Sequence, residues 1–225
     1  MKMQVKCDST LFGSWLFLVM PLGFAIALSA NSVLANQTVV HKTKVLAIEI
    51  AQKSFPEIKT KKIKVETFKS KTSFFKAQFS MLRYLTLQRM RHLLFVNPLV
   101  FEKEAPPEGI RSIIAHELAH ISYYTRKNRI ELLGLSRLSS NGFTAKFERK
   151  ADLEAIDRGY GKGLIVYREW LYNNIDQKEI FGKKRNYFTP RELKVILEVL
   201  KKKPAMIDVW KKNVPLNLEE IEKSV

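Results

Sequence analysis

Disulfide bonds cannot stabilise this chain, because its 225 residues include a single cysteine, Cys7. Internal repeats and low-complexity segments are also absent from the sequence, which argues against a repeat architecture. Apolar residues make up 46% of the chain, including 14 Phe and 3 Trp, and this is enough for a packed core. Stability must therefore come from that core, helped by a metal ion if one is bound.

Acidic residues are scarce relative to basic ones. The chain has 39 Lys and Arg against 22 Asp and Glu, which gives a formal net charge of +17. Such a field favours anionic partners such as lipid head groups, envelope polymers and acidic peptides, although an ordinary solvated basic surface explains it equally well. No nucleic-acid-binding motif accompanies the charge, so nucleic acid is not an expected partner.

The sequence has only one long apolar run. A basic start is followed by the uncharged segment Leu11–Ala30 and then by small residues in Val33–Ala35. This order is typical of a signal peptide, and we predict that residues 1–35 are removed by cleavage before Asn36. An uncleaved membrane anchor is the alternative, since about twenty apolar residues can span a bilayer. The prediction is an exported protein, periplasmic or extracellular, with its main domain in residues 36–225.

The motif H-E-x-x-H at His116, Glu117 and His120 carries the strongest chemical information. The two histidines are four positions apart and share one helix face, so both imidazoles can reach one metal ion. Pro106–Pro107 and a helical spacing of isoleucines predict that the motif lies on a helix. A short motif of this kind occurs by chance in roughly one such chain in two hundred, so a third ligand is needed.

A third ligand is available downstream, on a predicted helix that covers Ala145–Ile156. Glu148 can complete a site of two histidines and one glutamate. Asp152 follows four positions later on the same face and can accept a hydrogen bond from the outer nitrogen of a ligand histidine. Taken without the upstream motif, this segment is an ordinary solvated charged helix.

The H-E-x-x-H motif followed by E-x-x-A-D at Glu148–Asp152 resembles the gluzincin metallopeptidases, in particular the CAAX prenyl proteases and their small soluble envelope relatives. The resemblance covers about Leu93–Leu171. It implies an α+β zincin-like single domain with a small sheet, an active-site helix, a glutamate helix and a helical C-terminal part. It also implies that Leu94–Leu99 is an edge strand along which the substrate lies. The short interval between the motifs and the absence of a block of membrane spans favour the small soluble relatives.

Hydrophobic periodicity independently predicts an α+β chain, with a small sheet in the N-terminal half followed by helices. A capping box at Thr189 and Glu192 predicts the start of a late helix. The segment Asn128–Asn141 is predicted to be a substrate-facing loop, and Met81–Met90 is ambiguous. Further predicted elements are helices at Lys44–Lys53 and Leu164–Tyr172 and strands at Lys61–Phe68, Phe74–Phe79 and Leu93–Phe101. Pro98 indicates either that the last of these is an edge strand or that it ends there.

These residues predict a zinc metalloendopeptidase that acts on peptides or proteins. His116, His120 and Glu148 would bind Zn²⁺, and Glu117 would be the general base that activates water and returns the proton to the leaving amine. The alternative is a non-catalytic, zinc-containing envelope-binding protein that acts through its basic surface. The candidate oxyanion donors are Tyr187, Tyr160, Arg191 and His92.

Overall fold

The computed structural model describes residues 20–80, 83, 86, 88, 90–128, 131–132 and 141–224. Most of the predicted signal peptide, most of the predicted loop Asn128–Asn141 and most of Met81–Met90 lie outside these residues. The chain divides into two compact units, Met1–Thr38 and Val39–Val225. The second unit contains both halves of the predicted metal site.

Helix α1 (Met20–Ser54) is much longer than the predicted Lys44–Lys53 segment and passes without interruption through the predicted cleavage site. Its last turns bury Ala47, Ile50 and Ala51, which share one face and join the main core. Among the described residues, no helix combines the length and the apolar character that a membrane span requires.

The sheet has three strands, β1 (Ile63–Thr67), β2 (Phe75–Phe79) and β3 (His92–Val96), in the order β1-β3-β2. Strand β3 is parallel to β1 and antiparallel to β2. Since β3 is paired on both sides, the expectation that Leu94–Leu99 forms an edge strand is wrong. The edge strands are β1 and β2.

The strand predicted at Leu93–Phe101 ends early, because Asn97 turns the chain. The Asn97 side chain donates to the carbonyl oxygens of Ser70 and Ser73 at 2.7 and 3.2 Å, and its own oxygen accepts from the Leu99 amide at 3.3 Å. Pro98 has helical dihedral angles, and the short helix α3 (Leu99–Glu102) follows. Asn97 therefore ends β3 and also fixes the loop that leads into β2.

Helices dominate the rest of the chain and confirm the predicted α+β class. The Thr189–Glu192 capping box is present, since each residue's side chain accepts a hydrogen bond from the other's backbone amide. The helices are α4 (Pro107–Arg126), α6 (Asn141–Asp157), α7 (Gly161–Asn174), α8 (Gln177–Asn186), α9 (Pro190–Lys202), α10 (Met206–Lys212) and α11 (Leu218–Lys223).

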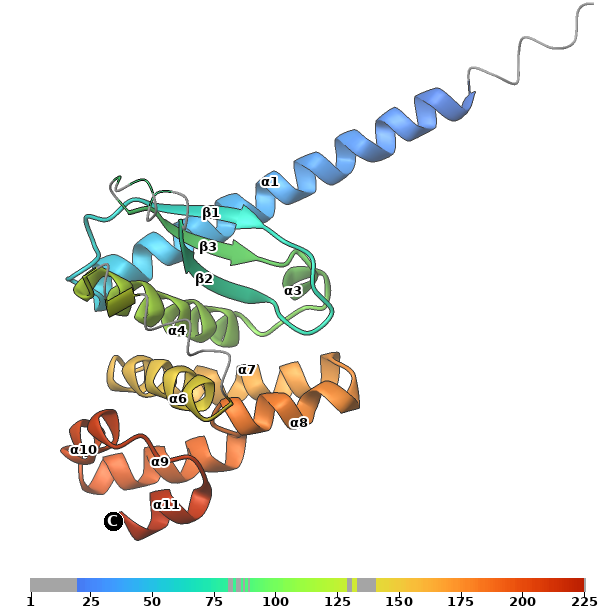
Figure 1. Cartoon of the computed structure of the whole chain (residues 1–225). Coiled ribbons are helices and arrows are strands. Elements are labelled where there is room, and N and C mark those ends of the chain that lie inside the picture. Colours follow the sequence, from blue (N-terminus) through green and yellow to red (C-terminus); the bar gives the residue numbers. More distant parts are fainter. Residues whose placement is uncertain are drawn as a thin grey trace, which may run out of the picture. The chain divides into compact units, whose positions relative to one another are not determined.

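Helix α4 is the central element of the second unit. It packs against β2 on one side and against α6 and α7 on the other, so it lies between the sheet and the helical layer (Figure 1). Ile113, Ile114 and Leu118 are buried in the core on this helix, and the apolar packing fixes its rotation. The rotation in turn decides which neighbours the two motif histidines meet.

Candidate metal centre

Three side-chain atoms from two helices converge at the contact between α4 and α6. The His116 Nε2 atom lies 3.1 Å from the His120 Nε2 atom. The Glu148 Oε2 atom lies 3.2 Å from the first of these nitrogens and 3.1 Å from the second. Both histidines are buried, with exposed fractions of 1% and 5%. The residues predicted to form one site from two distant motifs are therefore brought together.

The donor set and its spacing fit a zinc ion. Zinc ligands at about 2.0–2.1 Å in a tetrahedron are about 3.3 Å apart, and the three atoms here are separated by 3.1–3.2 Å. Two imidazole nitrogens and one carboxylate oxygen are the ligands that zinc prefers in hydrolytic sites with an open position. The cluster could hold a metal ion on geometric grounds, and its chemistry favours zinc.

Asp152 contacts the His116 ring at its Nδ1 atom, on the side away from the candidate metal site. Its carboxylate accepts a hydrogen bond from the His116 Nδ1 atom at 2.7 Å, from Arg168 at 3.0 Å and from the Phe188 amide at 3.2 Å. Burial raises the pKa of Asp152, but Arg168 and His116 outweigh burial and hold the pKa below its ordinary value. An ionised Asp152 makes Nδ1 the donor, which leaves the Nε2 lone pair free for a metal.

Glu117 lies on α4 next to these ligands, with an exposed fraction of 6%. Burial raises the pKa of Glu117, and His116 and His120 oppose this shift. The backbone of Ala77, on edge strand β2, lies close enough to the Glu117 carboxylate to oppose this rise in pKa as well. A buried carboxylate with a raised pKa is a better base near neutral pH than an exposed one.

Helix α6 contributes more than the metal ligand. Phe147 stacks on the His120 ring, with 4.6 Å between the ring centroids. Arg149 is buried on the opposite side and donates to Glu192 at 2.9 Å. The interpretation of this segment as an ordinary solvated helix is therefore wrong at both neighbours of Glu148. Phe147 positions His120, and Arg149 anchors α6 to α9.

The four candidate oxyanion donors differ in whether they lie near Glu117. Tyr187 lines a pocket together with Glu117, and its ring lies 5.8 Å from the His116 ring. Tyr160 is hydrogen-bonded to Ser54 at 2.9 Å, and Arg191 is exposed on α9. His92 is buried at the start of β3, where burial lowers its pKa. Of the four, only Tyr187 belongs to the pocket that contains Glu117.

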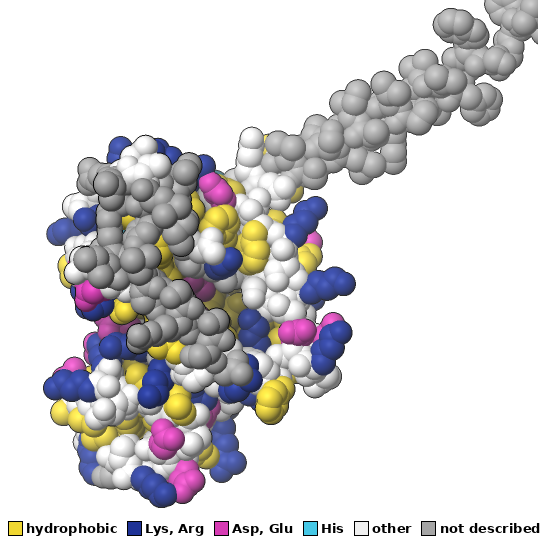
Figure 2. Space-filling view, in the orientation of Figure 1, with side chains coloured by type: hydrophobic (Ala, Val, Ile, Leu, Met, Phe, Trp, Pro, Cys, Tyr) yellow, Lys and Arg dark blue, Asp and Glu magenta, His cyan; other side chains and the backbone are white. Residues whose placement is uncertain are grey.

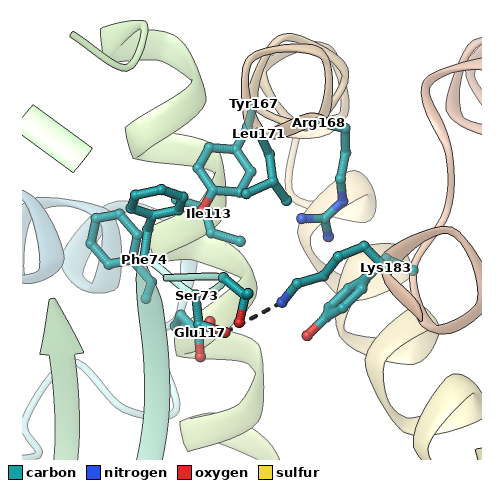
Figure 3. Close-up of a pocket in the computed structure, with 11 residues that line it drawn as sticks. Ser73, Phe74, Ile113, Glu117, Tyr167, Arg168, Leu171 and Lys183 are labelled. Atoms are coloured by element: carbon teal, nitrogen blue, oxygen red, sulfur yellow. Dashed lines mark hydrogen bonds between the residues drawn. The ribbon is translucent and has the colours of Figure 1, made fainter. Parts of the chain in front are cut away.

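Two cationic residues of this pocket, Arg168 and Lys183, were missed by the sequence reasoning. Both line it together with Glu117 and Tyr187 (Figure 3). The sequence held one signal for Arg168, which stands at helical spacing from Leu164 and Leu171 and therefore on the buried face of α7. A charge at such a core position indicates a buried ion pair. Lys183 had no comparable local signal.

Comparisons with known proteins add no identification: no protein-family model, curated protein or solved structure matches this chain. The residues and their geometry therefore carry the functional argument.

Proposed function

We propose that this protein is a zinc-dependent metallopeptidase of the gluzincin type. The observation that carries the proposal is the convergence of His116, His120 and Glu148 beside the buried carboxylate of Glu117. A purely structural zinc site needs no adjacent base, whereas a hydrolytic one does.

Each side chain has a defined task in peptide hydrolysis. Zinc held by His116, His120 and Glu148 would act as a Lewis acid towards the peptide carbonyl and would lower the pKa of water at the site. Glu117 accepts a proton from water as the water oxygen attacks the carbonyl carbon. It then donates that proton to the amine nitrogen as the C–N bond breaks. Asp152 keeps the His116 ring oriented throughout.

Tyr187 is the best placed of the four candidates to stabilise the developing oxyanion. Burial raises its pKa well above the ordinary value, with a further contribution from Glu148. The phenol therefore stays protonated and can donate a hydrogen bond at any physiological pH. Its ring packs against the Arg168 guanidinium, whose carbon lies 4.4 Å from the ring centroid, and this contact restricts where the hydroxyl points.

The substrate would bind along β2, not along β3 as the resemblance implied. Strand β2 is at the edge of the sheet, and its Ala77 backbone already reaches Glu117. An extended peptide can add to such an edge through main-chain hydrogen bonds. Binding there would place its carbonyl groups next to the general base.

Export remains part of the proposal and rests on the signal-like composition of residues 1–35. The exported chain would meet anionic envelope surfaces through its basic surface, and a retained N-terminal segment would anchor it to the membrane. N-terminal sequencing of the protein from fractionated cells distinguishes the two. A chain that starts at Asn36 supports cleavage, and an intact Met1 in the membrane fraction contradicts it.

The variant Glu117→Gln tests the catalytic proposal. It keeps the shape of the side chain but removes the base, so zinc should stay bound while hydrolysis falls by several orders of magnitude. The measurement is digestion of an unbiased peptide library by wild-type and variant proteins with equal zinc content.

Glu108→Gln is the matched control, because Glu108 is exposed in the first turn of the same helix. It should digest the library like the wild type. If zinc-loaded wild-type protein cleaves neither the library nor an envelope extract, the non-catalytic zinc-containing binding protein becomes the better account.

A further inference from the structure

The pocket beside Glu117 has an uneven distribution of charge. Its wall on the α7 and α8 side carries Arg168 and Lys183, and its opposite wall is formed by residues 72–75 and by α4 (Figure 3). Lys183 extends across the pocket towards Ser73, on the side where the Glu117 carboxylate lies. This arrangement places an ammonium group next to the proposed reaction centre.

Lys183 has unused hydrogen-bonding capacity. An ammonium group carries three N–H donors. The Lys183 Nζ atom donates one long hydrogen bond to the Ser73 hydroxyl, at 3.3 Å, and lies 5.4 Å from the centroid of the Tyr187 ring. Among the residues that the structure describes, no carboxylate forms an ion pair with it. Burial and the charge of Arg168 lower the pKa of Lys183, and the more distant carboxylates of Glu148 and Glu117 oppose this shift without reversing it.

A second donor on the same wall is also unused. Arg168 directs one terminal nitrogen to Asp152, but its Nε atom is buried and has no hydrogen-bond partner. A buried donor without a partner is costly, and such a group commonly marks a place where a ligand or water binds. The wall formed by α7 and α8 therefore carries two cationic side chains, each with N–H groups that have no hydrogen-bond partner among the described residues.

Resting on the proposed peptidase function, we infer that Lys183 forms the subsite that binds a substrate carboxylate next to the scissile bond. Ser73 holds the ammonium group in position, and Asn97 fixes Ser73 through its backbone carbonyl at 3.2 Å. The carboxylate belongs either to an Asp or Glu side chain or to the free C-terminus of the peptide. Both sources share the planar, anionic, acceptor-only chemistry that complements the N–H donors of the Lys183 ammonium group.

Peptide digestion by the zinc-loaded protein tests this inference. One set of end-blocked peptides differs only in Asp against Asn, or Glu against Gln, at positions flanking the cleaved bond. A second set contains no acidic residue and compares a free C-terminus with an amide. Wild-type protein should prefer the carboxylate member of one set by about 10–100-fold in kcat/KM, the range expected for hydrogen bonds to a charged group.

Lys183→Met keeps most of the apolar stem and removes the charge, so it should abolish that preference. Lys178→Met, exposed on the same helix, is the matched control and should retain it. An unchanged preference in Lys183→Met overturns the inference. So does an equal loss of rate on all peptides, because that result would make Lys183 a general electrostatic group and not a specificity residue.

Binding to the zinc-loaded protein separates this inference from the peptidase proposal. N-acetyl-aspartate amide and N-acetyl-asparagine amide are titrated by calorimetry against the wild type and Lys183→Met. Lys183-dependent binding of the aspartate probe alone, without cleavage of any peptide, supports the subsite and contradicts the peptidase. If peptides are cleaved with no preference for any carboxylate and both probes bind equally, the result supports the peptidase proposal and contradicts the Lys183 subsite.

Discussion

Asp152 connects the candidate metal ligand His116 to Arg168, which lines the neighbouring pocket. Its carboxylate accepts hydrogen bonds from His116, Arg168 and Phe188, and the side chain is completely buried. One residue therefore orients a ligand, neutralises a buried cation and fixes the start of the segment before α9. Such a residue is expected to affect both metal binding and folding when it is changed.

The variant Asp152→Asn should lower zinc affinity by about 10–100-fold, because the charge that supports His116 is lost. It should also lower the free energy of unfolding by about 3 kcal/mol, since Arg168 is left buried without its anionic partner. Zinc competition assays and chemical denaturation measure the two effects. Adding Arg168→Met should recover stability but not zinc affinity. Unchanged zinc affinity in Asp152→Asn would contradict the orienting role.

Proton competition should be visible at His116. Burial lowers its pKa, but Asp152 and Glu148 outweigh burial and raise the pKa to about 10 in the metal-free protein. A metal needs the neutral imidazole, so zinc binding below this pH must displace a proton. Apparent zinc affinity should therefore rise by about tenfold per pH unit between pH 6 and 8, as measured with a chelator of known pH dependence. An affinity independent of pH would contradict this.

At the scale of the elements, the packing of α7 against α4 positions Arg168 and, through it, Asp152. A Cβ atom placed on Gly163 would lie 2.5 Å from the backbone oxygen of Glu108, which cannot move away as a flexible side chain could. Glycine at this position allows the two helices to approach closely. The distance between the helices is thus set by a residue with no side chain.

Gly163→Ala should push α7 away from α4, lower the free energy of unfolding by about 1–3 kcal/mol and weaken zinc binding through the displaced Arg168. Gly182→Ala on α8 is the control, since its Cβ would meet nothing within 4 Å. This control should leave zinc binding unchanged and raise stability by up to about 1 kcal/mol, the helix propensity gain of alanine. Equal behaviour of the two variants would show that the close approach does not matter.

Local sequence patterns predicted where helices and strands occur, but they did not predict which elements lie next to each other in the fold. The capping box at Thr189 and the helix that carries Glu148 are encoded by residues close together in the sequence, so they were predictable. The central position of β3 was not, because strand order depends on pairing between distant segments. Pro98 indicated that β3 could end near this point, but the role of Asn97 was not predictable, since Asn97 acts through hydrogen bonds to Ser70 and Ser73, more than twenty residues away.

The candidate metal ligands were predictable for the same reason, because the i, i+4 spacing of His116 and His120 follows from helix geometry alone. Glu148 could be proposed only as a partner to that motif, and the structure brings its carboxylate to both rings. Lys183 and Ser73 could not be found, since neither has an informative sequence neighbour and their contact joins α8 to the loop before β2. Contacts of this kind depend on the complete fold, so the proposed substrate subsite could not be predicted from local sequence.

The whole molecule combines a basic exterior with an acidic site. The formal net charge is +17, and lysines and arginines are spread over the visible face of the described residues (Figure 2). By contrast, Glu117 and Asp152 are buried and Glu148 is partly buried beside the two motif histidines, and Glu117 also lines the pocket that contains Arg168 and Lys183. A field of this sign would attract anionic substrates over a distance, and the negative cluster would concentrate a divalent cation.

The most direct test of this account is the zinc content of the purified protein after equilibrium dialysis, measured for the wild type and for two variants. We predict one zinc ion per chain in the wild type, none in His116→Ala/His120→Ala and a severely weakened site in Glu148→Gln. Full zinc occupancy in the double histidine variant would contradict the metal centre, and with it the proposed peptidase.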